Sequence, residues 1–259
     1  MKIKASNIKS LDKGLKLLVD ISNYETGTTI TALDRKFRFG KSTIHRLLTT
    51  FKASDFIRHD IGNGRYMLGY KIFEMSHKFE QNTFLVMAGK RYLKDITRIT
   101  QETTNLGVLD GRDVIYLAKE ESFQQLRTSA PVGSRVPAPC TALGKSLLSD
   151  LSDKELDELY PSSKNLPKMT VRSIVNIRFL KRELQKIREE GISYDNEETV
   201  MGIRCIGVPI KNFTGKVVAA ISISLPAQRA DSNLIFKYSN PLKNKGEKLS
   251  RELGYKPNK

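Results

Sequence analysis

Residues 30–49, ITALDRKFRFGKSTIHRLLT, constrain the fold more than any other segment, because their apolar positions match two short helices that cross at a tight turn. The predicted inward-facing residues are Leu33, Phe37, Phe39, Ile44 and Leu47. The predicted outward set is basic and rich in hydroxyls, and it comprises Lys41, Ser42, Thr43, His45 and Arg46. Such side chains at the start of a second helix can reach phosphates and base edges. The segment therefore predicts a helix-turn-helix that reads DNA, with an amphipathic hairpin carrying a solvated basic face as the alternative.

Two positions in this motif differ from the usual pattern, which has a small residue in the first helix and a glycine in the turn. This chain has Asp34 and Arg38 there. An arginine in a left-handed turn costs about 1 kcal/mol or more relative to glycine. Gly40 follows two residues later and is available for the turn, so the geometry between the helices stays open. Pairing of Arg46 with Asp34 or Asp55 is the alternative to a DNA contact.

The flanking segments extend the motif into a winged helix-turn-helix over residues 7–70. Before it, Leu11, Leu15, Leu18 and Val19 repeat at helical spacing and predict a first helix, with Ser10 as the expected N-cap. After it, residues 56–59 and 65–68 flank the glycine-rich turn 60–64 and predict a hairpin. A hairpin in this position is a wing. We expect its residues Asn63 and Arg65 to touch the DNA backbone or minor groove.

The composition agrees with a polyanionic partner. The chain has 259 residues, a net charge of +16 and a sequence pI of about 9.8. This length favours two domains. The two cysteines, Cys140 and Cys205, lie far apart and outside any CxxC pattern, which argues against a disulfide framework or a cysteine-rich zinc site. We expect a soluble, cytoplasmic protein with no membrane segment, since no signal peptide or long apolar run is present.

The second half of the chain predicts an α+β domain. Residues 70–98 have helical character and suggest a linker helix and a second-domain helix. Strands are expected at 104–109, 114–118, 204–210 and 217–225, and helices at 176–190 and after the capping box of Ser152 and Glu155. The segment 231–253 is expected to form two helical pieces, because an interior proline such as Pro241 kinks or breaks a helix and Gly246 weakens it further.

Seven blocks resemble the IclR family of bacterial transcriptional regulators, in the family's order. They are SLDKGLKLL, KSTIHRLL, GRYMLGYKI, PCTALGKSLL, LKRELQKIREEGISYDNEE, MGIRCIGVPI and VVAAISIS. The resemblance implies a winged helix-turn-helix at 1–70, a linker helix at 71–90, and a GAF-like effector-binding and oligomerisation domain with an antiparallel sheet at 91–259. It also implies a homodimer or homotetramer on double-stranded operator DNA, and a small effector, usually a carboxylate or aromatic metabolite.

The resemblance also implies which residues line the effector pocket. They are Ala142, Leu143, Asp195, Cys205, Ser222 and Ser224. Ser222 and Ser224 lie two apart on a predicted strand, hence on one face, and can offer hydroxyls to a carboxylate. The start of the TALGKSLL helix can add backbone N–H groups. The alternatives are that the serines satisfy one another, that Cys205 is an ordinary buried residue and that Asp195 caps a turn.

The sequence thus predicts a ligand-responsive transcriptional regulator without enzymatic activity, cofactor or metal. No nucleophile elbow, HExxH pair or dinucleotide fingerprint is present, and LGKS around Lys145 lacks the upstream glycine of a P-loop. His45, His59 and His77 all precede the second domain, so no histidine there can activate Cys140. The alternatives are a GAF-like redox enzyme using Cys140 or Cys205 with an appended DNA-binding module, and an architectural DNA binder with an empty sensor domain.

Overall fold

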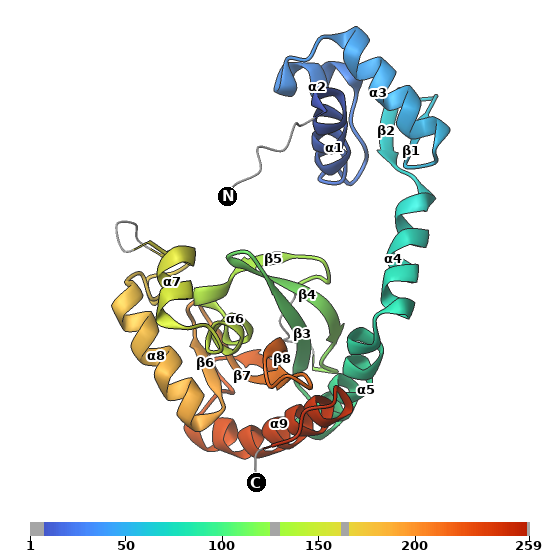
Figure 1. Cartoon of the computed structure of the whole chain (residues 1–259). Coiled ribbons are helices and arrows are strands. Elements are labelled where there is room, and N and C mark those ends of the chain that lie inside the picture. Colours follow the sequence, from blue (N-terminus) through green and yellow to red (C-terminus); the bar gives the residue numbers. More distant parts are fainter. Residues whose placement is uncertain (1–7, 125–129, 162–165, 258–259) are drawn as a thin grey trace. The chain divides into compact units, whose positions relative to one another are not determined.

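The computed structural model describes residues 8–124, 130–161 and 166–257, and it divides into two compact units, Met1–Asn82 and Thr83–Lys259. Figure 1 shows the elements of both units along the chain. The first unit contains the helices α1 (Lys9–Ile21), α2 (Ile30–Phe37), α3 (Lys41–Ala53) and α4 (Tyr70–Asn82). Between α3 and α4, β1 (Ile57–Asp60) and β2 (Arg65–Leu68) form an antiparallel hairpin. This order of elements is the predicted winged helix-turn-helix followed by a helix.

The first unit has its own apolar core. Fully or nearly fully buried in it are Leu17, Ile21, Leu33, Ile44, Leu48, Ile57 and Tyr66. The predicted inward residues Phe37, Phe39 and Leu47 pack against this cluster while staying partly exposed. A short bridge joins Thr28 to Tyr66 of the hairpin and ties the wing to the loop before α2.

Helix α1 forms where it was predicted, but a different face is buried. Leu11, Leu15 and Val19 are each more than half exposed, whereas Leu17 and Ile21 lie in the core. The reason is tertiary: a Cβ on Gly14 would lie 3.1 Å from the Phe51 ring, so the absence of a side chain lets α1 approach α3 along the 14–17–21 stripe. The expected N-cap was also wrong, since the capping position is Ile8, without a side-chain hydrogen bond.

The turn between α2 and α3 uses both residues that depart from the usual motif. Arg38 takes the left-handed conformation at φ 54°, and Gly40 has φ 83°. The Asp34 carboxylate accepts a hydrogen bond from the Gly40 N–H at 2.9 Å. This bond spans the turn, so Asp34 stabilises the conformation in which Arg38 is held.

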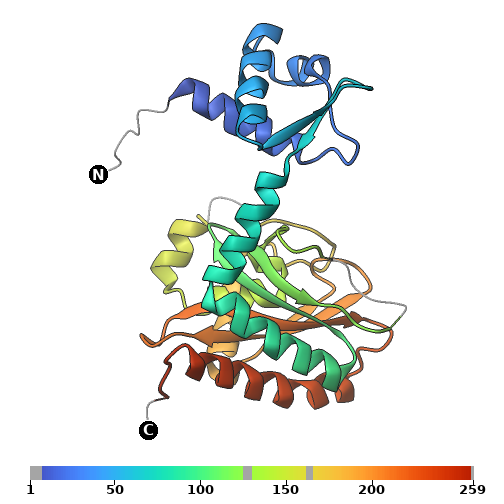
Figure 2. The ribbon, with the colours of Figure 1, turned by 90° about the vertical axis from the view of Figure 1, so that its right-hand side faces the viewer.

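The second unit is built on one antiparallel sheet. Its strands are β3 (Thr103–Asp110), β4 (Asp113–Glu120), β5 (Arg135–Pro137), β6 (Ser193–Asn196), β7 (Ile203–Lys211) and β8 (Val217–Pro226), in the spatial order β5-β4-β3-β8-β7-β6. One face packs against α5 (Phe84–Thr100) and α9 (Ser232–Glu252), which run along the same side of the sheet in Figure 2. On the other face are the 3₁₀ turn η1 (Ala138–Cys140), α6 (Ala142–Leu148), α7 (Asp153–Leu159) and α8 (Ile177–Glu190).

The predicted local signals in this unit are present. The four expected strands correspond to β3, β4, β7 and β8, and α8 runs from an Asn176 cap to a left-handed Gly191. Ser152 and Glu155 form the capping box of α7. The short strands β5 and β6 were not predicted, because three or four residues carry too little alternation to identify a strand from sequence.

The expectation that the last helix is interrupted was wrong. Helix α9 is 21 residues long and continues through Pro241 without a break. Leu242 and Leu249, on the C-terminal side of the proline, are completely buried. Their burial against the sheet offsets the backbone hydrogen bond that proline cannot donate. Gly246 lets the helix approach β7, since a Cβ there would lie 2.8 Å from Val208 Cγ2.

Candidate nucleic-acid interface and small-molecule cavity

Helix α3 presents most of the predicted DNA-contacting residues to solvent. Lys41, Ser42, His45 and Arg46 are exposed and Thr43 is half-buried, while Ile44 is completely buried on the opposite side. The N-cap Gly40 supplies no side chain to the first turn. The N–H groups of this turn and the basic side chains beside them are the elements with which a helix binds phosphate and base edges.

The Arg46 guanidinium forms no ion pair within the described residues. Of its two proposed partners, Asp34 is occupied by the Gly40 N–H, and Asp55 does not pair with Arg46. Arg46 therefore stands at the surface with its charge available to a ligand outside the domain.

The wing residues Asn63 and Arg65 are engaged within their own domain. Asn63 accepts the Arg65 N–H at 3.0 Å and donates to the Asp60 carboxylate at 2.6 Å. The Arg65 guanidinium donates to the Gly27 carbonyl at 2.9 Å and to the Thr26 hydroxyl at 3.3 Å. These bonds order the hairpin turn and hold the wing against the preceding loop, a structural role that the sequence did not indicate.

A cavity of about 460 Å³ lies between α6 and the sheet in the second unit. Its lining includes all six residues expected from the family resemblance: Ala142, Leu143, Asp195, Cys205, Ser222 and Ser224. Strand register explains how four of them meet. Asp195, Cys205 and Ser224 pair across β6, β7 and β8, and Ser222 pairs with Asn105 of β3. Paired residues in adjacent strands face the same side, so they form one polar floor.

In this floor the serine hydroxyls act as acceptors, so their own protons remain available for donation. Ser224 Oγ accepts from Asn105 Nδ2 at 3.2 Å and from Cys205 Sγ at 3.2 Å. Ser222 Oγ accepts from the same amide at 3.5 Å. A serine hydroxyl that accepts hydrogen bonds keeps its own proton for donation. The sequence left open that the two serines bond to one another. In the structure both bond to Asn105 instead.

From the sequence, Asp195 was expected either to line the pocket or to cap a turn, and in the structure it does both. Its carboxylate lines the cavity and also accepts the Glu198 N–H at 2.7 Å, which caps the turn after β6. Burial raises the pKa of Asp195 above its ordinary value. Protonation of this group lowers the negative charge of the cavity floor.

The cavity walls are apolar. They include Leu143, Val136, Met169, Val200 and Ile203. Arg135 also lines the cavity and is half-exposed, with its guanidinium paired to Asp110. A concave site with apolar walls and a few convergent polar groups is the usual form of a small-molecule site.

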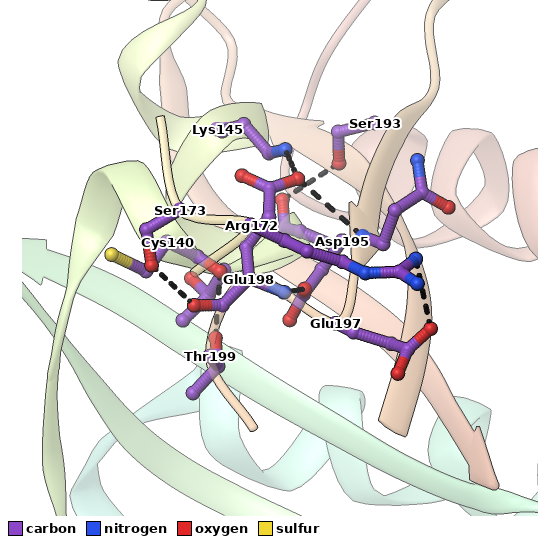
Figure 3. A network of polar contacts seen from close by, with 12 residues as sticks. Cys140, Lys145, Arg172, Ser173, Ser193, Asp195, Glu197, Glu198 and Thr199 are labelled. Atoms are coloured by element: carbon purple, nitrogen blue, oxygen red, sulfur yellow. Dashed lines mark hydrogen bonds and ion pairs between the residues drawn. The ribbon is translucent and has the colours of Figure 1, made fainter. Parts of the chain in front are cut away.

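A buried ion pair fixes the wall that carries Thr199 and Val200. Lys145, only 1% exposed, pairs with Glu198 at 2.5 Å, as Figure 3 shows. In the same network the Thr199 hydroxyl donates to the Cys140 carbonyl at 2.6 Å and Ser173 Oγ donates to the Glu198 carbonyl at 2.7 Å. Lys145 is thus committed to Glu198 and does not line the cavity, so it positions the wall.

The two cysteines lack the properties of redox nucleophiles. Burial raises the pKa of the Cys140 thiol and of the Cys205 thiol, which disfavours the reactive thiolate. Cys140 is completely buried, and Cys205 donates to Ser224 in the cavity floor. These contacts argue against the redox alternative.

Sequence reasoning missed several cavity residues, among them Asn105, Tyr116, Arg135 and Thr199. Asn105 had a signal, because an asparagine within the buried strand segment TTNLGV requires a polar partner. The others had none, since their segments meet the cavity only through tertiary packing.

Comparison with known proteins settles the family. The family model described as "Bacterial transcriptional regulator IclR C-terminal" matches residues 77–251. The chain belongs to the IclR family of transcriptional regulators. The HTH-type transcriptional regulator XynR of Escherichia coli (strain K12) is 32% identical over 248 residues, which cover 96% of this chain and 98% of XynR.

Solved structures of the IclR family agree with this assignment. The Thermotoga maritima IclR crystal structure matches with a TM-score of 0.79 and 33% identity, covering 96% of this chain and all of that one. The C-terminal domain of Escherichia coli KdgR matches with a TM-score of 0.60 and 32% identity, covering 66% of this chain and 99% of that domain. The chain is accordingly a DNA-binding transcriptional regulator and not an enzyme. In the described part of the chain, no helix is both long and apolar enough to span a bilayer.

Proposed function

We propose that this IclR-type regulator binds operator DNA through α3 and the wing, and that a small carboxylate-bearing metabolite in the cavity of the second unit modulates its affinity for the operator. The observation that carries the effector assignment is the polar floor on which Ser222 and Ser224 gather with Asp195 and Cys205. Because the target is bacterial operator DNA, we place the regulator in the cytoplasm.

The floor suits a carboxylate in two ways. Ser222 and Ser224 already accept hydrogen bonds, so both hydroxyls have protons to donate to carboxylate oxygens. Burial raises the pKa of Asp195, so this carboxyl is protonated more readily than an exposed one, and its protonated form would not repel a bound anion. Hydrogen bonds to a charged group contribute about 1.5–3 kcal/mol each, which is enough to select a carboxylate over a neutral analogue.

For the DNA interface we propose that Lys41, Ser42, Thr43, His45 and Arg46 contact phosphates or base edges. Asn63 and Arg65 approach the adjacent backbone with the atoms that their intradomain bonds leave free. Two observations support this proposal: the first turn of α3 is exposed, and Arg46 has no ion pair among the described residues.

We further propose a homodimer or a homotetramer as the binding form. One winged helix reads few base pairs, so specificity within a genome favours paired recognition helices on a two-fold operator. Helix α4 buries none of its residues, although Tyr70 and Phe73, which lie one turn apart on one face, are both more than half exposed. Exposed apolar side chains at helical spacing suit a contact between two copies.

The effector proposal is tested by the double variant Ser222→Ala with Ser224→Ala in the full chain. A thermal-shift screen of small carboxylates and phenolic acids first identifies a ligand, and calorimetry then compares the variant with the parent. We expect affinity to fall by about 1–3 kcal/mol. The matched control is Ser146→Ala, which removes a buried hydroxyl that bonds to Ser193 and does not line the cavity.

Unchanged affinity in the double variant would remove the serines from the site.

The DNA proposal is tested separately by gel shifts at graded salt against genomic and random DNA. A specific regulator binds its operator about 10³–10⁷ times more tightly than random sequence. Equal binding to both would favour an architectural DNA binder instead.

A further inference from the structure

Asn105 lies in the cavity floor with one amide atom unused. It belongs to β3, faces Ser222 across the strand pair and is 2% exposed. It borders the same cavity as Ser222, Ser224 and Asp195. Because it is held in the centre of the sheet, its position in the site is fixed by the fold.

The two ends of the Asn105 amide have different surroundings. Nδ2 donates to Ser224 Oγ at 3.2 Å and to Ser222 Oγ at 3.5 Å. Oδ1 is buried and has no hydrogen-bond partner among the described residues. A buried carbonyl oxygen without a partner is costly in a folded protein, and native structures usually reserve such atoms for a water or a ligand.

The groups beside Oδ1 indicate which kind of ligand could pair with it. The two serine hydroxyls next to the amide are donors, so they suit the oxygens of a carboxylate. Oδ1 is an acceptor and has the opposite requirement. A ligand that satisfies all three groups carries a hydrogen-bond donor close to its carboxylate.

We propose that Asn105 is a specificity-determining residue of the effector site, and that it selects hydroxycarboxylates by accepting a hydrogen bond from a ligand hydroxyl near the carboxylate. This inference rests on the proposed carboxylate site. A site built to bond a hydroxyl rejects the analogue that lacks it, because the protein's polar atom then stays unpaired.

The experiment uses the full chain and matched ligand pairs that differ by one hydroxyl. The pairs are glycolate and acetate, lactate and propionate, and mandelate and phenylacetate. Dissociation constants come from thermal shift and calorimetry. We expect the hydroxylated member to bind at least about tenfold more tightly in every pair that binds. This comparison needs no variant, so it stands even if a substitution prevents folding.

The substitution Asn105→Leu then assigns the preference to the amide. The leucine has a similar size but neither the acceptor nor the donor to the two serines. Loss of the serine bonds affects both members of a pair alike, so the readout is the ratio of their dissociation constants, which we expect to fall to within about threefold. Ser146→Ala is the control, and it should keep the preference of the parent chain. Its hydroxyl is buried outside the cavity.

The outcomes separate the two proposals. Equal or tighter binding of the deoxy members by the parent chain would overturn the role of Asn105 without contradicting the carboxylate site. This result is expected if the amide is rotated so that Nδ2 faces the ligand. A preference that persists in Asn105→Leu would also overturn it. If no member of any pair binds at 100 mM or so, the carboxylate site fails and this inference fails with it.

Discussion

At the scale of single residues, Arg46 gives the sharpest test of the DNA interface. It is exposed on α3, and its guanidinium forms no ion pair with any residue that the structure describes. We expect Arg46→Ala to weaken operator binding by about 1–3 kcal/mol and to relax specificity at the base that it reads. Lys52→Ala is the matched control, because it removes one exposed positive charge from the last turn of the same helix. Gel shifts in which both variants keep parental affinity would exclude Arg46 from the interface.

Asp195 gives the second test at this scale, through pH. Burial raises the pKa of its carboxyl above the ordinary value, so the folded protein binds this proton more tightly than the unfolded chain. The free energy of unfolding therefore falls as pH rises from about 4, the unfolded pKa, through the higher folded pKa. Asp195→Asn removes this dependence.

Urea unfolding at several pH values measures the effect of Asp195→Asn. We expect the unfolding free energy of the variant, relative to the parent, to increase as pH rises from about 4 to 7. A difference that stays constant, or that shrinks with rising pH, would contradict the raised pKa. The comparison with the parent cancels the titrating groups that do not interact with Asp195. Glu198, whose pKa the Asp195 charge helps to raise, adds to the difference in the same direction.

At the scale of elements, α9 illustrates how packing overrides helix propensity. Gly246→Ala would gain about 1 kcal/mol of propensity. The new Cβ would lie 2.8 Å from Val208 Cγ2, and such overpacking costs about 1–3 kcal/mol. We expect a net loss of stability in chemical denaturation. Asn244→Ala, at an exposed position of the same helix, should instead be neutral or slightly stabilising. A stabilising Gly246→Ala would show that α9 does not need this close approach.

At the scale of the whole molecule, symmetry is the central prediction. If two copies meet through α4, Phe73→Asp places a charge on the contact twice and should shift the protein toward monomer. Sedimentation measures this shift, and footprinting should show a pseudo-palindromic operator with reduced protection by the variant. Asn82→Asp adds the same charge at an exposed polar position of α4, nine residues from Phe73 and therefore on the opposite side of the helix, and it serves as the control. A monomer that protects one asymmetric half-site at full affinity would contradict the model.

Much of the local structure could be predicted because its signals lie within a few residues of one another. The capping box of Ser152 and Glu155, the Asn176 cap and the Gly191 end of α8 are short-range features, and all three are present. The order of motifs also indicated the family. The six expected effector residues come from segments that the resemblance could align one by one, and the structure gathers them on one cavity.

What the sequence could not determine depends on contacts between distant segments. Which face of α1 is buried follows from Gly14 against Phe51, and the continuity of α9 through Pro241 follows from the burial of Leu242 and Leu249. The pairing of Lys145 with Glu198 joins residues 53 positions apart. The same holds for Asn105, whose partners lie more than a hundred residues away. Periodicity and propensity act over a few residues, whereas burial and hydrogen-bond satisfaction are decided only when the sheet and its helices have assembled.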